Sequence, residues 1–349
     1  MTTATTTDQA EPIGVGIVGT GIMAKAHARV VGEDPRVRLA GWVSRRADPP
    51  GLAEFGPVPV YQSIEDLLRD ESVRVVIVAT PDFAHREPGV AAARAGRHVL
   101  IEKPLATSIE DAEAIRDAVK AAGVHAMTLF NQRWAPAYWQ AKQELAQPDA
   151  GQPIMAYARK NDTLYVPTGM LSWADRSSPS WFLSSHDIDL VTWFFEAPPV
   201  EVYATAVHKV LAGRGIDTPD AVHAQVRFAD GAVATFESCW VVPDGYPTVV
   251  ESFVEVLTSN RHIHIDRKVE QLEVATADGI RYPRTGGTQI AGRHVGPPAS
   301  AVRHFIDVVT EGREPLIPLD HSVEVTRLLA AIERSYRTGA PVRVEGGAA

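Results

Sequence analysis

The fold of this chain is decided by one stretch near its N-terminus, Val15-Gly16-Ile17-Val18-Gly19-Thr20-Gly21-Ile22-Met23-Ala24. A short apolar run leads directly into a GxGxxA pattern that opens a helix, which is the context a dinucleotide-binding turn requires. Gly19 permits the tight turn, Gly21 lets the backbone approach a pyrophosphate, and Ala24 keeps helix and strand close. The alternative is a plain glycine turn. The agreement with the surrounding strands favours dinucleotide binding by Gly19, Thr20, Gly21, Ile22 and Met23.

Residues 13–130 alternate short β-rich runs with helical patterns, which is typical of βαβ units on a parallel sheet. The predicted strands are Val15–Gly19, Val37–Ser44, Val58–Tyr61, Arg74–Thr80, His98–Glu102 and Val124–Phe130. Two helices are predicted to start at Ser63, with Asp66 three residues on, and at Thr107, with Glu110 three residues on, because each hydroxyl can accept from free helix amides. Gly123 is placed to stop the second helix. The pattern predicts a doubly wound nucleotide-binding domain.

Residues 131–349 have a different character, with longer strands joined by hairpin signals. Asp230-Gly231 and Asp278-Gly279 suit tight hairpin turns, and Ser259-Asn260 is a third candidate. A helix is expected around Trp139–Ala146, and residues 299–338 form helical segments broken at 312–318. The whole chain is therefore predicted to be α/β, with an N-terminal parallel sheet and a C-terminal α/β domain with an open, mainly antiparallel sheet. Residues 1–12 are expected to be a disordered tail.

The amino-acid composition of the chain excludes several classes of protein. The 349 residues include 34 basic and 43 acidic side chains, a net charge of −9, which argues against an extended nucleic-acid surface. The single cysteine, Cys239, rules out an internal disulfide and a thiolate zinc cage. No apolar run reaches about 18 residues, and no targeting signal is recognisable. We expect a cytoplasmic protein without a nucleic-acid or membrane partner.

The end of the second predicted strand bears on cofactor choice. It carries Ser44, Arg45 and Arg46 and no carboxylate. An acidic residue there reads a free ribose 2′-hydroxyl, whereas serine and arginine can bond a 2′-phosphate. The sequence thus favours NADP over NAD. The alternative, solvated loop charges, is nearly as well supported.

Two more segments follow parallel strands at the edge where ligands bind. The first contains Thr80, Pro81 and His85, and the second contains Glu102 and Lys103. A lysine partly removed from water beside a cationic nicotinamide has its ammonium form disfavoured, which suits proton transfer. Lys103 is therefore the first catalytic candidate. The alternative is a surface lysine that merely ends a strand.

A second candidate lies at the start of a helix in the C-terminal half. Ser184 or Ser185 can cap that helix, which places His186 and Asp189 on one face. His186 could take a hydroxyl proton while the carbon gives up a hydride. The alternatives are a capping cluster, in which Asp187 and Asp189 favour the helix N-terminus, and a metal site, for which the pattern is too sparse. No metal is predicted.

Three aromatic residues, Tyr165, Trp173 and Trp181, flank the segment before His186. Core packing explains them, and a sugar-binding wall is the alternative, because aromatic faces pack on apolar C–H surfaces. With Lys103, Asp187 and His186 they form the predicted substrate site.

Taken together, these motifs resemble the Gfo/Idh/MocA oxidoreductases, named for glucose-fructose oxidoreductase and inositol dehydrogenase. The resemblance covers nearly the whole chain. It depends on the GxGxxA turn and on Thr80-Pro81 with His85, Glu102-Lys103-Pro104, Asn131 with Arg133, His186 with Ile188-Asp189-Leu190, and Tyr336-Arg337-Thr338-Gly339. It implies a Rossmann domain, a bound nicotinamide dinucleotide contacted also by Asn131, a polyol or sugar-like substrate, and a homodimer or homotetramer formed through the C-terminal sheet.

By the same resemblance, Lys103 and His186 would be the catalytic lysine and histidine of an NAD(P)-dependent dehydrogenase or reductase acting on a secondary alcohol or ketone. There is one departure. Many dehydrogenases of this family carry an aspartate four residues before the histidine, and this chain has Phe182. A charge partner for the lysine and histidine is missing there. This departure keeps open a catalytically silent dinucleotide-sensing regulator on the same fold, while a metal-dependent hydrolase using His186 and Asp187 is a more distant alternative.

Overall fold

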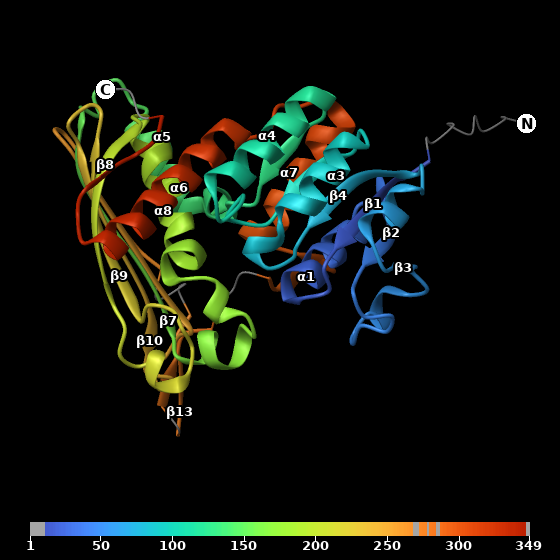
Figure 1. The fold of residues 1–349 in the computed structure, drawn as a ribbon, viewed down its shortest axis with the longest axis horizontal. Helices are drawn as coiled ribbons and strands as arrows, with labels where there is room; N and C mark the ends of the chain where they lie inside the picture. The colour runs from blue at the N-terminus through green and yellow to red at the C-terminus, as the bar shows by residue number, and fades with distance from the viewer. Residues whose placement is uncertain (1–10, 268–271, 278, 284–286, 347–349) are drawn as a thin grey trace, which may run out of the picture.

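The computed structural model describes residues 11–267, 272–277, 279–283 and 287–346. Most of the predicted tail and Asp278 of one predicted hairpin lie outside these residues. The described residues build two large sheets side by side, with helices between them and around the first (Figure 1). Within the described ranges, no helix has the length and apolar character needed to cross a membrane.

The first sheet has six parallel strands in the order β3-β2-β1-β4-β5-β6. The order reverses between β1 and β4, which is where doubly wound sheets bind ligands. Runs rich in valine and isoleucine form these strands because both faces of the sheet are covered. The strands are β1 Ile13–Val18, β2 Val37–Val43, β3 Val60–Tyr61, β4 Val73–Val78, β5 His98–Ile101 and β6 Ala126–Thr128. All six predicted strands are present, and their ends differ from the predicted ones by at most two residues.

Helices α1 Ile22–Val31, α2 Ile64–Leu68, α3 Arg86–Arg94 and α4 Ile109–Ala122 connect these strands. Ser63 caps α2 as predicted, accepting from the Asp66 amide. The predicted start at Thr107 is wrong by one residue, because the extended Ser108 places its Oγ 3.1 Å from the Asp111 amide. Gly123 ends α4 in the left-handed conformation, which glycine adopts without strain.

The second sheet has seven strands in the order β12-β11-β7-β10-β9-β8-β17, and only the β7–β10 pair is parallel. This confirms an open, mainly antiparallel sheet. Asp230-Gly231 turns β9 into β10, and Ser259-Asn260 turns β11 into β12, as predicted. The strands are β7 Pro153–Thr163, β8 Pro199–Val207, β9 Ala221–Phe228, β10 Val233–Val242, β11 Val250–Thr258, β12 His262–Asp266 and β17 Val342–Arg343; two small hairpins are β13 Val274–Thr276 with β14 Gly279–Arg281 and β15 Gln289–Ile290 with β16 Arg293–His294.

Four helices belong to the second half of the chain: α5 Pro136–Leu145, α6 Ser185–Phe195, α7 Pro297–Glu311 and α8 Leu319–Thr338. Helix α5 starts three residues before the predicted Trp139, because Pro136 is favoured in the first helical turn. Helices α6 and α8 pack on the second sheet, on the side that faces the first sheet (Figure 1). Helix α8 also packs on α4, and α7 packs on α1, so the end of the chain returns to the nucleotide-binding sheet. Apolar residues of both halves share one core cluster.

Short helical turns complete the chain and position several site residues. They are η1 Ala53–Phe55, η2 Asp82–Ala84, η3 Asn131–Trp134, η4 Val166–Met170, η5 Ala174–Arg176, η6 Ser180–Ser184 and η7 Ala212–Arg214; η4 and η6 are π-helical. The π turn η6 runs directly into α6, which begins at Ser185 with Ser184 in the N-cap position, as predicted, but the predicted side-chain cap is absent. Ser184 has helical backbone angles and makes no side-chain cap. The helical stretch therefore begins at Ser180, before the histidine.

Candidate active site

The turn between β1 and α1 has the geometry of a phosphate cradle. Gly19 has φ +107°, and a Cβ there would lie 2.4 Å from the Ala79 carbonyl oxygen, so only glycine fits. A Cβ on Gly21 would meet nothing within 4 Å, which leaves open space in front of the turn. Helix α1 has no side-chain cap, so its first amides face that space. These features fit the pyrophosphate of a dinucleotide.

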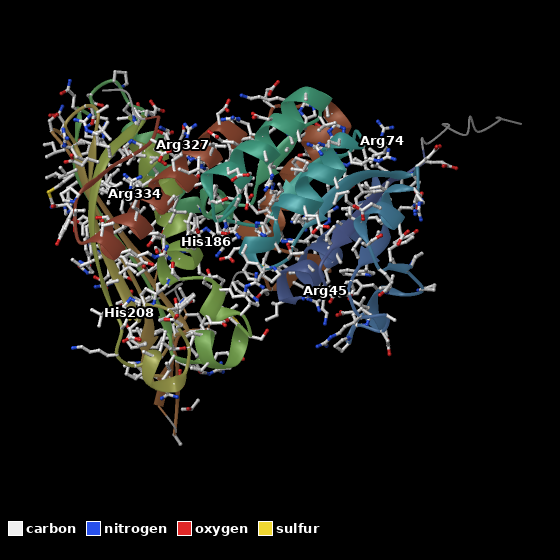
Figure 2. The ribbon with its side chains drawn as sticks, viewed as in Figure 1. Arg45, Arg74, His186, His208, Arg327 and Arg334 are labelled. Carbon is white, nitrogen blue, oxygen red and sulfur yellow. The ribbon has the colours of Figure 1, made fainter. Side chains whose placement is uncertain are left out.

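The end of β2 carries the residues predicted to choose the cofactor. Ser44 Oγ accepts a hydrogen bond from the Arg46 amide at 3.0 Å, which fixes the start of this loop. The Arg45 and Arg46 side chains are exposed, and Figure 2 shows Arg45 on the same part of the molecule as α1. A 2′-phosphate contact by these residues stays a prediction.

Glu102 is engaged by a residue that the sequence did not single out. His27 of α1, itself buried, lies with its Nε2 2.7 Å from Glu102 Oε1. Burial alone raises the pKa of Glu102, but the hydrogen bond and charge of His27 and the charge of Lys103 bring that pKa below its ordinary value. The signal in the sequence was a histidine at helical spacing on the buried face with Ala24 and Ala28. This contact ties α1 to the end of β5.

The segment after β4 is tied to Lys103-Pro104 by His85. The two ring nitrogens of this buried histidine lie 2.8 Å from the Pro104 carbonyl oxygen and 3.1 Å from that of Thr80. The Thr80 hydroxyl donates to the Ala84 carbonyl at 3.0 Å. These polar groups hold the loop itself together, so any cofactor contact from Thr80, Pro81 or His85 stays a prediction.

Lys103 lies where the two halves meet. Its Nζ donates to the Phe182 carbonyl oxygen at 2.5 Å and lies 3.9 Å from the centroid of the Phe182 ring. Removal from water lowers the pKa of the Lys103 ammonium, and the charges of Glu102 and Asp82 partly offset this. A larger share of the amine is thus available for proton exchange. Because Phe182 lies one helical turn before His186, this bond brings Lys103 to the start of α6.

His186 occupies the first turn of α6, and Figure 2 places it between the two sheets. Its side chain is half-buried. The structure therefore brings the two predicted catalytic residues to the same end of one helical stretch, from elements more than eighty residues apart in the sequence. Asn131 opens η3 after β6, and its predicted cofactor contact stays untested.

Asp187 does not act as a helix cap. It is fully buried, and its Oδ1 accepts from the Nζ of Lys160 on β7, which also donates to Ser252 Oγ at 3.1 Å. Burial raises the pKa of the Asp187 carboxyl, and the charge of Lys160 opposes this. Its Oδ2 has no hydrogen-bond partner among the described residues. Sequence reasoning missed Lys160, whose only signal was a charged residue at an inward-facing strand position.

Asp189 likewise lies in a buried ion pair. Arg133 of η3 donates to both carboxylate oxygens, from Nη2 at 2.7 Å and from Nε at 3.1 Å, and His321 Nε2 lies 2.9 Å from Oδ1. Burial raises the pKa of Asp189, but the Arg133 charge and the hydrogen bond to His321 bring it below its ordinary value. The interpretation of Asp187 and Asp189 as a capping cluster is therefore wrong. The Arg133–Asp189 pair anchors the His186 helix to the turn that follows β6, the last strand of the first sheet.

Besides Glu102, the buried carboxylate of Asp82 lies close enough to Lys103 to act on its charge. Asp82 is 3% exposed and accepts from the Ser177 hydroxyl at 2.5 Å and from the Phe83 amide at 2.8 Å. Burial raises the pKa of its carboxyl, against the charges of His85 and Lys103. Asp82 also links the loop after β4 to the segment before η6.

The three aromatic residues predicted to contact substrate lie in three different environments. The Trp173 ring centroid lies 6.1 Å from that of Phe182, beside Lys103. Tyr165 is 52% exposed at the start of η4. Trp181 belongs to the main core. It also lines a cavity of about 420 Å³ with Glu333, Tyr336 and Arg337, and Lys103 is not among the lining residues of that cavity. Of the three, Trp173 alone has a contact that leads to Lys103.

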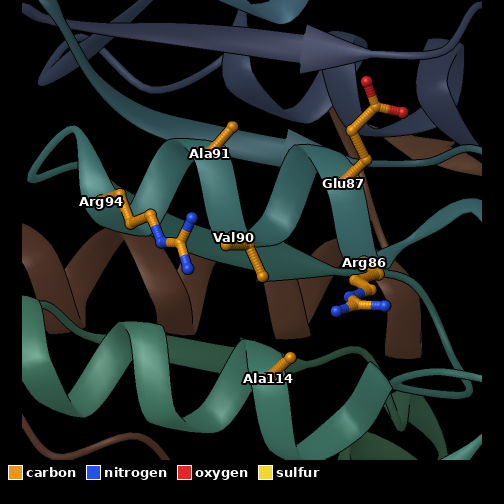
Figure 3. A pocket seen from close by; sticks show the side chains of 6 residues that line it. All are labelled: Arg86, Glu87, Val90, Ala91, Arg94 and Ala114. Atoms are coloured by element: carbon orange, nitrogen blue, oxygen red, sulfur yellow. The ribbon is translucent and has the colours of Figure 1, made fainter. Parts of the chain in front are cut away.

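Another cavity, of about 390 Å³, lies between α3 and α4 (Figure 3). Its lining residues are Arg86, Glu87, Val90, Ala91, Arg94 and Ala114. They include none of the predicted site residues. Across the described part of the chain, no group of three or more histidine, cysteine, aspartate or glutamate side chains is arranged to hold a metal ion.

A six-stranded parallel sheet with an open glycine turn after its first strand defines a dinucleotide-binding protein. Comparison with known proteins agrees. Residues 13–130 match the model described as "Oxidoreductase family, NAD-binding Rossmann fold", and residues 138–264 match the "GFO/IDH/MocA C-terminal domain". The chain belongs to the Gfo/Idh/MocA family of oxidoreductases.

Three relatives illustrate the range of this family. The levoglucosan dehydrogenase of Pseudarthrobacter phenanthrenivorans is 30% identical over 265 residues, covering 65% of this chain and 67% of that protein. An inositol 2-dehydrogenase of Rubrobacter xylanophilus is 30% identical over 247 residues, covering 69% of each. The crystal structure of GenD2 from gentamicin A biosynthesis, in complex with NAD, superposes with a TM-score of 0.84 at 26% identity, covering 97% of this chain and 98% of that one.

Proposed function

We propose that this protein is an NAD(P)-dependent dehydrogenase or reductase that moves a hydride between nicotinamide and a secondary alcohol or ketone carbon of a cyclic polyol, sugar or sugar derivative. The observation that carries the proposal is the contact between Lys103 Nζ and the Phe182 carbonyl, which brings a partly desolvated amine to the helical stretch that presents His186. The names of the relatives, which act on sugars or inositols, support this substrate class.

Lys103 and His186 act on the same substrate oxygen in this proposal. In the oxidising direction, His186 accepts the hydroxyl proton while Lys103 donates a hydrogen bond to that oxygen and stabilises its developing charge. In the reducing direction the same proton returns from His186 to the carbonyl oxygen. Tyr165, Trp173, Trp181 and Asp187 are the further substrate contacts we predict. Asp187 Oδ2 would accept from a substrate hydroxyl, which is supported by its lack of a hydrogen-bond partner among the described residues.

The cradle at Gly19 and Gly21 would hold the pyrophosphate. When bound, a nicotinamide dinucleotide supplies the hydride donor or acceptor at its C4 atom. We propose NADP as the preferred form, because Ser44 and Arg45 lie at the end of β2 where a carboxylate would repel a phosphate. Ser44→Asp should shift the ratio of kcat/KM for the two cofactors toward NAD by about tenfold or more. An unchanged ratio would contradict this assignment.

We further propose that the protein works in the cytoplasm as a homodimer or homotetramer. The outward face of the seven-stranded sheet supports this, because it carries half-exposed apolar side chains such as Met155, Tyr203 and Val233. Sedimentation equilibrium tests the proposal, and a monomer at micromolar concentration would contradict it.

The activity is tested by following the absorbance of reduced nicotinamide with a panel of polyols and sugars. Lys103→Met and His186→Ala are each expected to lower kcat by about 10² or more on an active substrate. Lys120→Met is the matched control, because this exposed lysine pairs with Asp320 at 2.9 Å on the surface. If both active-site variants matched the wild type, the assignment would be wrong.

A second candidate is a dinucleotide-sensing regulator that binds cofactor and turns nothing over. The observation that favours it is that Lys103 Nζ is already bonded to the Phe182 carbonyl. Tight cofactor binding without turnover on any member of the panel, together with a partner protein bound only in the presence of cofactor, would support this alternative.

A further inference from the structure

Four aromatic rings form a row that passes the ammonium group of Lys103. The ring centroids of Phe83 and Trp173 lie 6.0 Å apart, those of Trp173 and Phe182 6.1 Å, and those of Phe182 and Trp240 5.8 Å. Lys103 Nζ lies 3.9 Å from the Phe182 centroid. We call Phe83, Trp173, Phe182 and Trp240 the aromatic row. It joins the loop after β4 to β10 across the proposed reaction centre.

One end of the aromatic row is held in a buried apolar cluster. Trp240 is fully buried and packs with Ala174, Leu183 and Leu211 in a small apolar cluster separate from the two main cores. Phe83, Trp173 and Phe182 are half-buried, so part of each residue stays accessible. Because their backing is apolar and close-packed, these rings have little freedom to turn aside for a polar substituent.

The position of Phe182 determines what surrounds the reacting carbon. An oxygen that accepts from Lys103 Nζ lies about 3 Å from it, and therefore beside the Phe182 ring. A substrate hydroxyl turned toward that ring leaves water without gaining a partner, which costs about 1–3 kcal/mol. A C–H surface turned toward the same ring gains contact instead.

The polar groups of the site lie on other elements. The charges that act on Lys103 are those of Glu102 beside it, Asp82 after β4, and Asp162 and Lys160 on the inward face of β7. Asp187 Oδ2 and Ser238 Oγ are buried polar atoms without a partner among the described residues, and Ser238 pairs with Lys160 in register. The site thus offers hydrogen bonds from β7, β10 and α6, and an apolar surface along the aromatic row.

We propose that the aromatic row, with Phe182 at its centre, selects a cyclic substrate that lacks a hydroxyl on the ring face or carbon adjacent to the reacting carbinol, such as a deoxy or anhydro sugar. This specificity rests on the proposed dehydrogenase function and adds the substrate class to it. A fully hydroxylated cyclitol would turn one hydroxyl toward Phe182 and bind with a penalty.

The test compares matched pairs of probes on the complete enzyme with saturating cofactor. The pairs are inositol with a monodeoxyinositol, and glucose with its 1,6-anhydro form. The wild type should favour the less hydroxylated member by about tenfold or more in kcat/KM. Phe182→Asp should reduce or reverse that ratio by about tenfold, because a carboxylate accepts from the hydroxyl. Phe182→Leu is the matched control, and it should keep the preference because the site stays apolar.

Calorimetric binding of the same pairs separates the possible failures. A preference for the less hydroxylated probe appears in the ratio of the two Kd values even if neither probe is turned over. A protein without activity would therefore contradict the proposed function, while the binding ratio would still test this inference. An equal or inverted ratio in the wild type, or a ratio unchanged by Phe182→Asp in a variant whose circular dichroism matches the wild type, overturns the proposal.

Discussion

Two carboxylates on the same turn of α6 have opposite environments. Asp189 has both oxygens filled by Arg133 and His321, and its pKa lies below the ordinary value. Asp187, two residues earlier, has one oxygen filled by Lys160, and its pKa is raised by burial. A fully satisfied pair fixes one architecture, whereas an incompletely satisfied one leaves an acceptor for a ligand. The difference indicates that Asp189 holds the helix, and it agrees with the role in the site that we propose for Asp187.

The largest expected effect comes from breaking the satisfied pair. Arg133→Leu leaves the Asp189 carboxylate buried without its main partner, and should lower the free energy of unfolding by about 3–5 kcal/mol. Urea denaturation measures this loss. Arg133→Lys keeps the charge but not the two parallel bonds, and should lose less. A loss below about 1 kcal/mol for Arg133→Leu would contradict a structural role for this pair.

Breaking the Lys160–Asp187 pair should lower the free energy of unfolding less than breaking the Arg133–Asp189 pair, and should impair activity more. In Lys160→Met, Asp187 can take up a proton, because burial already favours its neutral form, so we expect a loss of about 1–2 kcal/mol. The substrate KM should rise about tenfold or more, since the acceptor at Asp187 is altered beside His186. Steady-state kinetics and urea denaturation check both numbers, with Lys120→Met as the control. An unchanged KM with a large loss of stability would show that Asp187, like Asp189, has a structural role.

The two carboxylates should also differ in the sign of their pH dependence. Asp189 has a lowered folded-state pKa, so its stabilisation is present above the unfolded-state value of about 3.9 and is lost as pH falls through the folded-state value. Asp187 has a raised pKa, so ionisation costs stability at neutral pH, and protonation removes that cost as pH falls.

Unfolding measured between pH 7 and about pH 2 tests this, because the contribution of Asp189 begins to fall only near the unfolded-state pKa. The difference in stability between wild type and Asp189→Asn should shrink toward acid pH, whereas the corresponding difference for Asp187→Asn should shift in favour of the wild type. Parallel slopes for the two variants would show that the carboxylates do not differ in this way.

The smallest effect concerns Asp82, a third buried carboxylate. Asp82→Asn removes a negative charge that raises the pKa of Lys103, so the pKa should fall further and the amine should react about two- to fivefold faster with an acylating reagent at fixed pH. Peptide mass spectrometry of the Lys103 peptide measures the rate without any substrate. Ser177→Ala, which removes a hydrogen bond to Asp82 and leaves its charge, should change the rate less. A slower reaction in Asp82→Asn would contradict the predicted sign.

Much of the fold could be predicted because its signals are local. The glycine turn at residues 19–24, the cap at Ser63 and the hairpin at Asp230-Gly231 each depend on neighbouring residues alone. Lys103 and His186 were predicted from short motifs at the ends of elements. The cap at Thr107 was wrong by one residue because adjacent threonine and serine carry the same hydroxyl signal.

The partners of the site residues were not predictable in this way. His27 and Glu102, Arg133 and Asp189, and the Lys160 partner of Asp187 are separated by tens of residues, so only the folded chain brings them together. The sequence shows that Phe182 replaces a charged residue, but the contact of Phe182 with the Lys103 ammonium depends on the packing of η6 against the end of β5. Pairings of this kind leave no periodic signal in a single sequence.

The return of α7 and α8 to the first sheet bears on how the chain folds as it leaves the ribosome. Phe305 of α7 belongs to the same core cluster as Ile17 of β1, and Leu319 and Val323 of α8 pack in the core around β4 and β5. A nascent chain that ends near residue 130 has all six strands of its first sheet but exposes the apolar surface that these helices cover. We therefore expect the first 130 residues, expressed alone, to aggregate or bind chaperones, and native protease resistance to arise only once α8 has been synthesised.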